Sequence, residues 1–421
     1  MNYLTAPSLS LNPCKAPIVG SLCLPGSKSI TNRALLLAAL AKGESRLLRA
    51  LASDDTRHMS EALLAMGVTV ESPSPSEFRV VSEGFLTEPV GPLFLGNAGT
   101  ATRFLTAALA TQKGTFIVDG DEHMQKRPIA PLVDALSRLG ISARTDTGCP
   151  PVEITSPGGF GASKVEIDAG LSSQYISALL MAGPLHSEAF QLQLTGTDIG
   201  AKGYIEITLS VMRAFGAEVA QINEGLWVVQ PTGYQPVPTY HIEPDASAAT
   251  YLWAAEKLTN GKIDLGVAPQ SMMQPDAQAW DIIQAWPHMP GEIEGSQIQD
   301  AIPTLAVMAA FNQTPVRFVG IENLRVKECD RISACCNELN RIKPRLAGEE
   351  QAELLVHSDP GLIGGKTDAQ IETYHDHRIA MAFSLAGLLM EGITILDPGC
   401  VAKTYPEYWN DLASLGVSLV R

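Results

Sequence analysis

Apolar, helix-like stretches return along the chain at nearly constant intervals, each after a short run of small or polar turn residues. Successive starts lie 72, 73, 73, 56 and 74 residues apart. This spacing predicts six copies of one unit, the fourth of them shortened, and the unit is too long for the common solenoids. The six stretches begin at Lys28, Thr100, Ser173, Ala246, Ile302 and Asp376.

A second helical pattern lies between these stretches and ends in a glycine followed by an apolar residue. Clear examples are residues 56–68, 127–141, 204–217 and 405–417. Short β-rich runs such as FIVDG, QLQLTG and ITILD separate the helices. The pattern predicts an α/β (α+β) protein with two similar domains of three units each. Chance spacing of helices in an ordinary α/β protein is the alternative.

Composition and charge exclude several classes of protein. Hydrophobic residues make up 45% of the chain and charged residues 18%, as in an ordinary soluble globular protein. No run of about 18 apolar residues occurs, so no membrane contact is expected. The net charge of −15 argues against nucleic acid as a partner. Seven cysteines without C-x-x-C spacing, and no signal-peptide pattern, predict reduced thiols and a cytoplasmic location.

Cations stand repeatedly where helices are expected to begin, although the positive end of the helix dipole repels them. Each of them alone could be a solvated or carboxylate-capped side chain. Five such placements in different units instead suggest a ligand with several negative charges, bound in a cleft fed by both halves of the chain. They are Lys28, Arg103, Arg127, Arg331 and Arg378.

Other patterns in the chain carry less weight. His375 and His377 look like metal ligands, but their spacing at a helix start and the lack of a third ligand argue against a metal. The glycine-rich run GNAGTATR lacks the lysine of a nucleotide P-loop. Ser172 and Ser173 are read locally as N-cap residues. We therefore expect neither a metal nor a cofactor.

Seven motifs together resemble the 5-enolpyruvylshikimate-3-phosphate synthase family over residues 24–409. They are LPGSKSITNRALLLAALA, LGNAGTATRFLTAALA, DGDEHMQKRPI, SSQYISALLMA, RVKECDRI, YHDHRIAMAFSLAGL and DPGCVAKTYPEYW. The resemblance implies an inside-out α/β barrel type of fold, with three βαβαββ units in each of two domains. It implies a domain of residues 23–240 on the shikimate-3-phosphate side, and a second domain of residues 1–22 and 241–421.

The resemblance also implies an activity, which is transfer of the enolpyruvyl group of phosphoenolpyruvate to the 5-hydroxyl of shikimate-3-phosphate, with release of phosphate, in chorismate biosynthesis. A monomer with these two small-molecule substrates is expected. The alternatives are UDP-N-acetylglucosamine enolpyruvyl transferase, which usually has Lys-Asn in place of Lys28-Ser29, a non-catalytic phosphometabolite-binding homologue, and an RNA 3′-phosphate cyclase-like protein.

Site residues carry over from the family by motif. For phosphoenolpyruvate they are Lys28, Gly99, Arg127, Gln174, Arg331, Arg378 and Lys403. For shikimate-3-phosphate they are Lys28, Ser29, Arg33, Thr100, Ser172, Ser173, Gln174, Tyr204, Asp300, Asn323 and Lys327. Asp300 is the implied base for the attacking hydroxyl. Glu328 and Lys28 are both candidates for proton donation, with His377 nearby.

The chain departs from the family pattern at three positions. Ala201 replaces an expected serine at the shikimate phosphate, and His375 replaces a common asparagine. Phe104 stands where many members have proline or leucine. In the family, glyphosate competes with phosphoenolpyruvate. The run that begins at Gly99 favours inhibition by it, and Phe104 is expected to weaken that inhibition.

Overall fold

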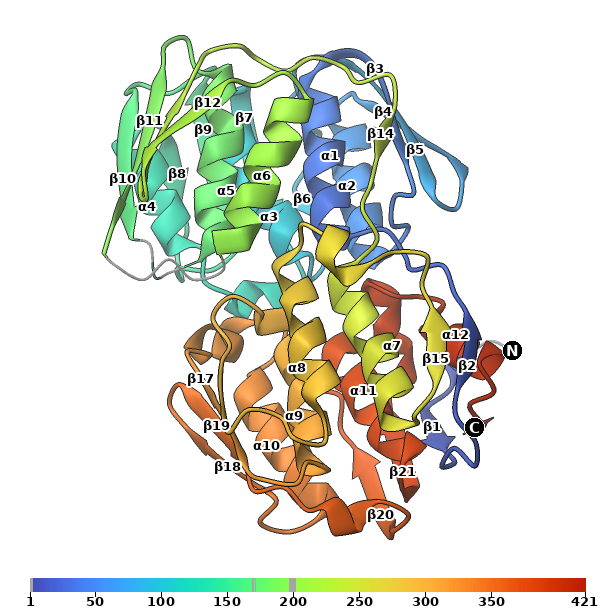
Figure 1. Ribbon diagram of the computed structural model, residues 1–421. Helices are drawn as coiled ribbons and strands as arrows, with labels where there is room; N and C mark the ends of the chain where they lie inside the picture. Colours follow the sequence, from blue (N-terminus) through green and yellow to red (C-terminus); the bar gives the residue numbers. More distant parts are fainter. Residues whose placement is uncertain (1–2, 169, 171, 197–201) are drawn as a thin grey trace. The chain divides into compact units, whose positions relative to one another are not determined.

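The computed structural model describes residues 3–168, 170, 172–196 and 202–421. Contacts within the chain divide it into two compact units, which we describe separately (Figure 1). The middle unit is Gly26–Glu243. The terminal unit combines Met1–Pro25 with Pro244–Arg421 and so contains both chain ends.

The part of the middle unit that the structure describes contains three four-stranded sheets with one shared topology. Their strand orders are β14-β3-β5-β4, β6-β7-β9-β8 and β10-β11-β13-β12. In each sheet the first pair is parallel and the other pairs are antiparallel. The strands are β3 (Lys42–Leu48), β4 (Thr69–Ser74), β5 (Glu77–Glu83), β6 (Leu93–Phe94), β7 (Lys113–Asp119), β8 (Ser142–Arg144), β9 (Val152–Pro157), β10 (Lys164–Asp168), β11 (Phe190–Thr195), β12 (Val219–Asn223), β13 (Leu226–Val229) and β14 (Tyr240–His241).

Among the described residues of the middle unit, six helices accompany these sheets, and three of them form its core. Helices α1, α3 and α5 are buried along almost their whole length, as expected for helices that are apolar all round. Figure 1 shows the helices bundled together with the sheets on their outer sides. The helices are α1 (Lys28–Leu40), α2 (Asp54–Ala65), α3 (Gly99–Leu109), α4 (Ala130–Arg138), α5 (Ser173–Ala182) and α6 (Lys202–Ala214).

The terminal unit repeats this plan around the buried helices α7, α9 and α11. Two of its sheets have the same topology, with orders β16-β17-β19-β18 and β20-β21-β1-β22, and the third is the parallel pair β15-β2. The elements are β1 (Ser8–Leu11), β2 (Val19–Ser21), α7 (Ala246–Leu258), β15 (Lys262–Asp264), α8 (Ala279–Ala285), β16 (Glu292–Glu294), α9 (Ile302–Ala310), β17 (Val316–Val319), α10 (Arg331–Ile342), β18 (Ala347–Glu350), β19 (Glu353–Val356), β20 (Lys366–Ile371), α11 (His377–Ser384), β21 (Glu391–Leu396), α12 (Tyr408–Ser414) and β22 (Leu419–Val420).

These sheets confirm the predicted fold of two α/β units with three repeats each. The fourth repeat has only the two-stranded sheet β15-β2, which accounts for the short interval of 56 residues in the sequence. Strands also come from distant parts of the chain: β14 completes the first sheet beside β3, and β1 lies between β21 and β22. In each unit the buried helices lie inside and the sheets lie outside.

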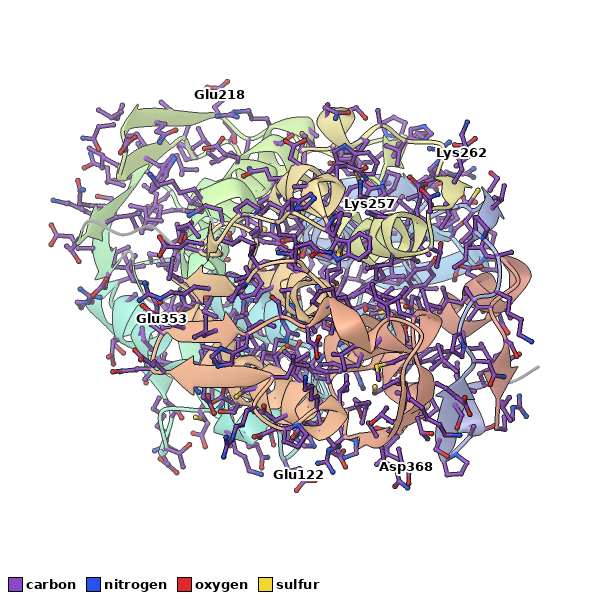
Figure 2. The ribbon with its side chains drawn as sticks, turned by 60° about the horizontal axis from the view of Figure 1, so that its bottom comes forward. Glu122, Glu218, Lys257, Lys262, Glu353 and Asp368 are labelled. Atoms are coloured by element: carbon purple, nitrogen blue, oxygen red, sulfur yellow. The ribbon has the colours of Figure 1, made fainter. Side chains whose placement is uncertain are left out.

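Charged side chains lie mostly on the outside of each unit. Figure 2 shows this for Glu122, Glu218, Lys262 and Asp368, which are exposed. Among the residues that the structure describes, no helix combines the length and apolarity needed to span a bilayer. Because burying a charge costs free energy, the few charged side chains that are buried require a specific explanation.

Candidate active site

Lys28 is the first residue of α1 and is placed there by a tight turn. A Cβ atom on Gly26 would overlap the carbonyl oxygen of Arg49, so only glycine allows the two chain segments to pack this closely. The Lys28 Nζ atom lies 3.5 Å from the Oδ2 atom of Asp55, and both side chains are largely buried. Asp55 was not predicted from the sequence, because only the fold brings it to the start of α1.

Arg33, one turn further along α1, is a buried cation with neutral partners. Its Nε atom donates to Thr208 Oγ1 at 2.7 Å, and its Nη1 atom donates to the backbone oxygen of Ser29 at 2.8 Å. The guanidinium also lies 4.8 Å from the ring centre of Phe104. Burial lowers the pKa of Arg33 to about 10, against the opposing effect of Tyr204. An anion at this position would therefore be favourable.

The start of α3 carries the backbone of the glycine-rich run. Arg127 lies across this start, and its Nη1 atom donates to the Asn97 Oδ1 atom at 2.9 Å. A Cβ atom on Gly99 would come within 2.7 Å of the Arg127 Nη2 atom, so glycine leaves the space that the guanidinium occupies. Thr100 follows, is buried, and accepts a hydrogen bond from Asn32 Nδ2 at 3.2 Å.

Arg103, on the next turn of α3, has a structural role. Its Nη2 atom donates to the Pro128 oxygen at 2.7 Å and its Nη1 atom donates to the Gly99 oxygen at 3.2 Å. These bonds tie α3 to the segment that carries Arg127. Of the five cations at expected helix starts, Arg103 is the one that supports the segment carrying Arg127.

Three predicted site residues lie together at the start of α5. The Ser172 Oγ atom accepts from the backbone N–H of Gln174 at 3.2 Å, which confirms the N-cap prediction for Ser172. Ser173 is buried. Tyr204 lies on α6, where its backbone oxygen accepts from Arg33 Nη2 at 3.2 Å. Ala201 lies outside the described residues.

In the terminal unit, Arg331 is surrounded by three carboxylates, which come from two successive repeats. Its side chain is only 1% exposed. It donates to Asp300 Oδ1 at 2.8 Å, to Glu328 Oε2 at 2.7 Å and to Asp376 Oδ2 at 2.7 Å. Burial opposes the charge of Arg331, but the three carboxylates hold its pKa well above the ordinary value. The arginine thus fixes the orientation of all three acids.

Arg378 and Lys403 extend this cluster. The Arg378 Nη2 atom donates to Asp300 Oδ2 at 2.7 Å, and the Lys403 Nζ atom lies 3.4 Å from Glu328 Oε1. Each of these two carboxylates therefore contacts two cations. We name the six side chains the charged cluster: Asp300, Glu328, Asp376, Arg331, Arg378 and Lys403.

Helix starts position the charged cluster. Asp376 caps α11 by accepting from the backbone N–H of Arg378 at 2.9 Å. Arg331 opens α10, whose N-cap is Asp330. Asp300 precedes α9 on the short 3-10 helix Gln299–Ala301. His377 is fully buried, with its Nδ1 atom 3.6 Å from Asp376 Oδ1.

Two predicted residues lie on the segment that leads to Glu328. Asn323 is half-buried on the 3-10 helix Glu322–Val326, and Lys327 is the residue that ends it.

Strained backbone precedes Asp376. Tyr374 and His375 both have φ of 54°, a left-handed conformation that is uncommon for residues other than glycine. The Tyr374 hydroxyl donates to Glu338 Oε1 at 2.8 Å, and the His375 Nδ1 atom lies 2.8 Å from Asp397 Oδ2. These contacts hold the turn.

Asp376 and Asp276 were not predicted as site residues. Asp276 is fully buried and accepts from Ser247 Oγ. Burial raises the pKa of Asp276 to about 7, and the charge of Asp300 adds to this effect while Arg378 opposes it. Asp376 stands inside a recognised motif, but nothing in its local sequence indicates the contact with Arg331.

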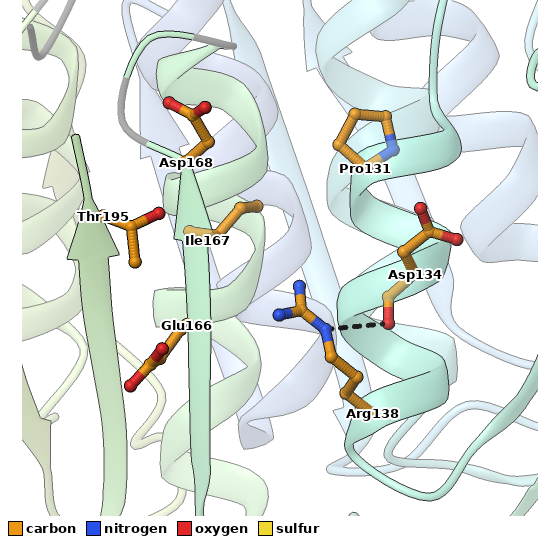
Figure 3. A pocket seen from close by; sticks show the side chains of 7 residues that line it. All are labelled: Pro131, Asp134, Arg138, Glu166, Ile167, Asp168 and Thr195. Atoms are coloured by element: carbon orange, nitrogen blue, oxygen red, sulfur yellow. Dashed lines mark hydrogen bonds between the residues drawn. The ribbon is translucent and has the colours of Figure 1, made fainter.

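A surface cavity of about 360 Å³ in the middle unit contains none of the predicted site residues (Figure 3). Three carboxylates and one arginine line it, so it is unsuited to an anionic ligand. Its lining residues are Pro131, Asp134, Arg138, Glu166, Ile167, Asp168 and Thr195.

Comparison with known proteins connects these charged groups to a family. A sequence model of EPSP synthase (3-phosphoshikimate 1-carboxyvinyltransferase) matches residues 14–412. The chain belongs to the EPSP synthase family. The 3-phosphoshikimate 1-carboxyvinyltransferase of Pseudomonas syringae pv. tomato is 61% identical over 414 residues, which cover 98% of this chain and 99% of that protein.

Other members of the EPSP synthase family agree with this match. The enzyme of the same name from Rhizobium leguminosarum bv. trifolii is 59% identical over 410 residues, covering 97% of each chain. The solved EPSP synthase of Acinetobacter baumannii has a TM-score of 0.77 at 23% identity, covering 98% of this chain and all of that one. The latter likeness supports the fold alone.

Proposed function

We propose that this chain transfers the carboxyvinyl (enolpyruvyl) group of phosphoenolpyruvate to the 5-hydroxyl of shikimate-3-phosphate and releases phosphate. The observation that carries the proposal is the 61% identity, over nearly the full length, to a 3-phosphoshikimate 1-carboxyvinyltransferase. The named relatives have the shikimate activity, so UDP-N-acetylglucosamine enolpyruvyl transferase is not supported as an alternative.

Phosphoenolpyruvate has a phosphate and a carboxylate on a three-carbon frame, and we propose that planar arginine donors bind both groups. Buried arginines at helix starts support this, because they present several fixed N–H groups to an anion. The proposed residues are Lys28, Gly99, Arg127, Gln174, Arg331, Arg378 and Lys403.

Shikimate-3-phosphate is proposed to bind chiefly to the middle unit. Arg33 supports this assignment, since it is buried and its hydrogen-bond acceptors are neutral oxygens. Its guanidinium would pair with the shikimate carboxylate together with Ser29. The remaining proposed residues are Lys28, Thr100, Ser172, Ser173, Gln174 and Tyr204, with Asp300, Asn323 and Lys327 from the terminal unit.

The reaction needs a base for the attacking hydroxyl and an acid for the methylene carbon. We propose Asp300 as the base and Glu328 or Lys28 as the acid, and we include His377 among the proposed catalytic residues. The fixed orientation of both carboxylates by Arg331 supports these roles. All seven cysteines are free, which is consistent with the proposed cytoplasmic location; we also propose a monomer.

Phosphate release by purified, EDTA-treated protein tests the function. With both substrates present, we expect stoichiometric phosphate and a new enol ether, detected by NMR. Release that requires an added divalent metal would contradict the proposed site. Binding of both substrates without phosphate release would instead indicate a non-catalytic homologue.

Variants test the proposed roles. Lys28→Ala or Glu328→Gln should reduce turnover by at least about a hundredfold, as expected for positioned acid–base groups. The control is Glu353→Gln, which removes a charge from an ion pair with Arg317 at the surface of the terminal unit (Figure 2). Near-normal turnover in both active-site variants would remove them from the mechanism.

A further inference from the structure

Glu338, on α10, is a carboxylate whose side chain has no exposure to solvent. Burying a carboxylate costs free energy unless hydrogen bonds compensate for the lost water. Among the described residues, its donors are Arg341 Nε at 2.8 Å, the Glu372 backbone N–H at 3.0 Å and the Tyr374 hydroxyl at 2.8 Å. Arg341 lies on the same helix, whereas Glu372 and Tyr374 lie outside it. The carboxylate therefore connects α10 to a second segment of the chain.

That segment is residues 372–376, which lead from β20 to α11 and which we name the α11 turn. Tyr374 and His375, within it, have the left-handed φ of 54°. Backbone in this region persists only where the surrounding structure fixes it. Glu338 fixes the turn at two points, through the backbone N–H of Glu372 and the hydroxyl of Tyr374.

The Tyr374 hydroxyl is a lasting donor in this arrangement. Burial and the hydrogen bond to Glu338 raise the pKa of Tyr374 to about 12, so the phenol keeps its proton near neutral pH. The other contact of the turn, between His375 and Asp397, is more exposed, with 67% and 43% of the two side chains accessible. Exposed ion pairs hold a conformation only weakly. The buried Glu338 is thus the stronger anchor of the α11 turn.

The α11 turn ends at Asp376, which joins two helix starts. Its carboxylate accepts from the backbone N–H of Arg378 at 2.9 Å and from Arg331 Nε at 2.7 Å. Arg331 lies seven residues before Glu338 on α10, so the two side chains lie on one face of that helix. Helix α10 therefore contacts the α11 turn twice, through Arg331 at Asp376 and through Glu338 at Tyr374. A displacement of the turn at Tyr374 would move Asp376 and Arg378 with it.

Resting on the proposed function, we propose that Glu338 is a positioning residue for phosphoenolpyruvate binding, because it holds the α11 turn in the conformation that places Arg378 and Asp376. It acts through Arg378 and Arg331, which we assign to phosphoenolpyruvate, and not by contact with the substrate. Shikimate-3-phosphate is assigned chiefly to the middle unit. Loss of the hydrogen bonds to Glu338 should therefore weaken phosphoenolpyruvate binding more than shikimate-3-phosphate binding.

Tyr374→Phe tests this role with the least change, since it removes one hydroxyl and keeps the ring. The KM and the calorimetric Kd for phosphoenolpyruvate should rise about three- to thirtyfold, as for loss of one hydrogen bond to a charged acceptor. The KM for shikimate-3-phosphate and kcat should change much less. The matched control is Tyr408→Phe, which removes a buried hydroxyl that lies 2.7 Å from Ser384 Oγ at the other end of α11. It should lower the free energy of unfolding without raising the KM for phosphoenolpyruvate.

Two substitutions of Glu338 separate its hydrogen bonds from its contribution to stability. In Glu338→Gln the side-chain oxygen can accept from the Glu372 N–H while the amide donates to the Tyr374 hydroxyl oxygen. This variant should therefore recover most of the phosphoenolpyruvate affinity that Glu338→Ala loses. Adding Tyr374→Phe to Glu338→Ala should cause little further loss, because both changes remove the same hydrogen bond. If Glu338→Ala does not fold, the comparison of Tyr374→Phe with Tyr408→Phe decides.

An unchanged affinity for phosphoenolpyruvate in folded Tyr374→Phe overturns the proposal. An equal loss in Tyr408→Phe, or an equal loss for shikimate-3-phosphate, overturns it as well, because either would show a general effect of stability. Glu338→Gln that binds phosphoenolpyruvate no better than a folded Glu338→Ala overturns the role of the hydrogen bonds. Absence of phosphate release by the wild-type protein is a separate result, against the proposed function. The calorimetric Kd needs no turnover and still tests the positioning role in that case.

Discussion

At the scale of single residues, Phe104 has a contact that its sequence position did not indicate. Its expected effect on glyphosate inhibition stays a prediction, and the structure adds that its buried ring lies 4.8 Å from the Arg33 guanidinium. A cation near an aromatic face is stabilised and held in place. Phe104 thus positions the cation that we assign to the shikimate carboxylate.

Replacing Phe104 by leucine tests this role. A desolvated cation–π contact is worth roughly 0.5–2 kcal/mol, so Phe104→Leu should raise the KM for shikimate-3-phosphate by a few-fold to about thirtyfold. Steady-state kinetics should show a smaller effect on kcat. Phe116→Leu, at a fully buried position on β7, is the control for loss of core volume. An equal rise in KM in the control would contradict the role of the aromatic face.

Asp276 links the stability of the protein to pH. Burial raises its pKa to about 7, above the value near 4 expected in the unfolded chain. The folded state therefore binds this proton more tightly, and its stability falls as pH rises from about 4 to about 7. Asp276→Asn removes that dependence.

Unfolding at two pH values tests this link. The free energy of unfolding of Asp276→Asn minus that of the wild type, measured with urea, should be larger at pH 8 than at pH 5. The exposed Asp281→Asn on α8 is the control. A stability difference for Asp276→Asn that is the same at both pH values would contradict the raised pKa.

At the scale of elements, helix starts determine where charged side chains are placed. Lys28 opens α1, Arg331 opens α10, and Asp376 caps α11. Short local motifs at these helix starts thus fix the positions of charged side chains from distant parts of the sequence. The start of α3 differs, because it presents the backbone of Gly99 and no charged side chain in its place.

Gly99→Ala tests the close approach at the start of α3. The added Cβ atom would lie 2.7 Å from Arg127 Nη2, the flexible end of a side chain, so the fold should tolerate it while the guanidinium moves. We expect a rise of a few-fold to about tenfold in the KM for phosphoenolpyruvate and a larger loss of inhibition by the longer glyphosate. Gly91→Ala, where nothing lies within 4 Å of the new atom, is the control. Unchanged kinetics in Gly99→Ala would show that Arg127 adapts without cost.

At the scale of the whole molecule, the two units differ in how the chain builds them. The middle unit is continuous, and its three sheets use only its own strands. The terminal unit needs β1 between β21 and β22 and β2 beside β15, and both strands come from the first 25 residues.

Truncated chains test this difference. Residues 26–243 alone should unfold cooperatively, whereas residues 244–421 alone should not, because the loss of β1 exposes apolar edges of β21 and β22. Joining residues 1–25 after Arg421 through a flexible linker should restore cooperative unfolding, measured by circular dichroism. Cooperative unfolding of 244–421 without these residues would show that β1 is dispensable.

The sequence alone determined the sixfold repeat, the shortened fourth copy and the cations at helix starts. These features depend on periodicity and turn residues within short segments, so they can be read locally. The family motifs are also contiguous, and they led to the same family as the comparison with known proteins.

The tertiary structure decided which groups meet. Arg331 contacts Asp300 and Asp376, which lie 31 and 45 positions away, and Arg33 packs on Phe104. The local sequence around Asp376 or Asp276 does not indicate these partners, because contacts between repeats depend on how helices from separate segments pack. Burial then sets their protonation, since only the folded chain removes them from water.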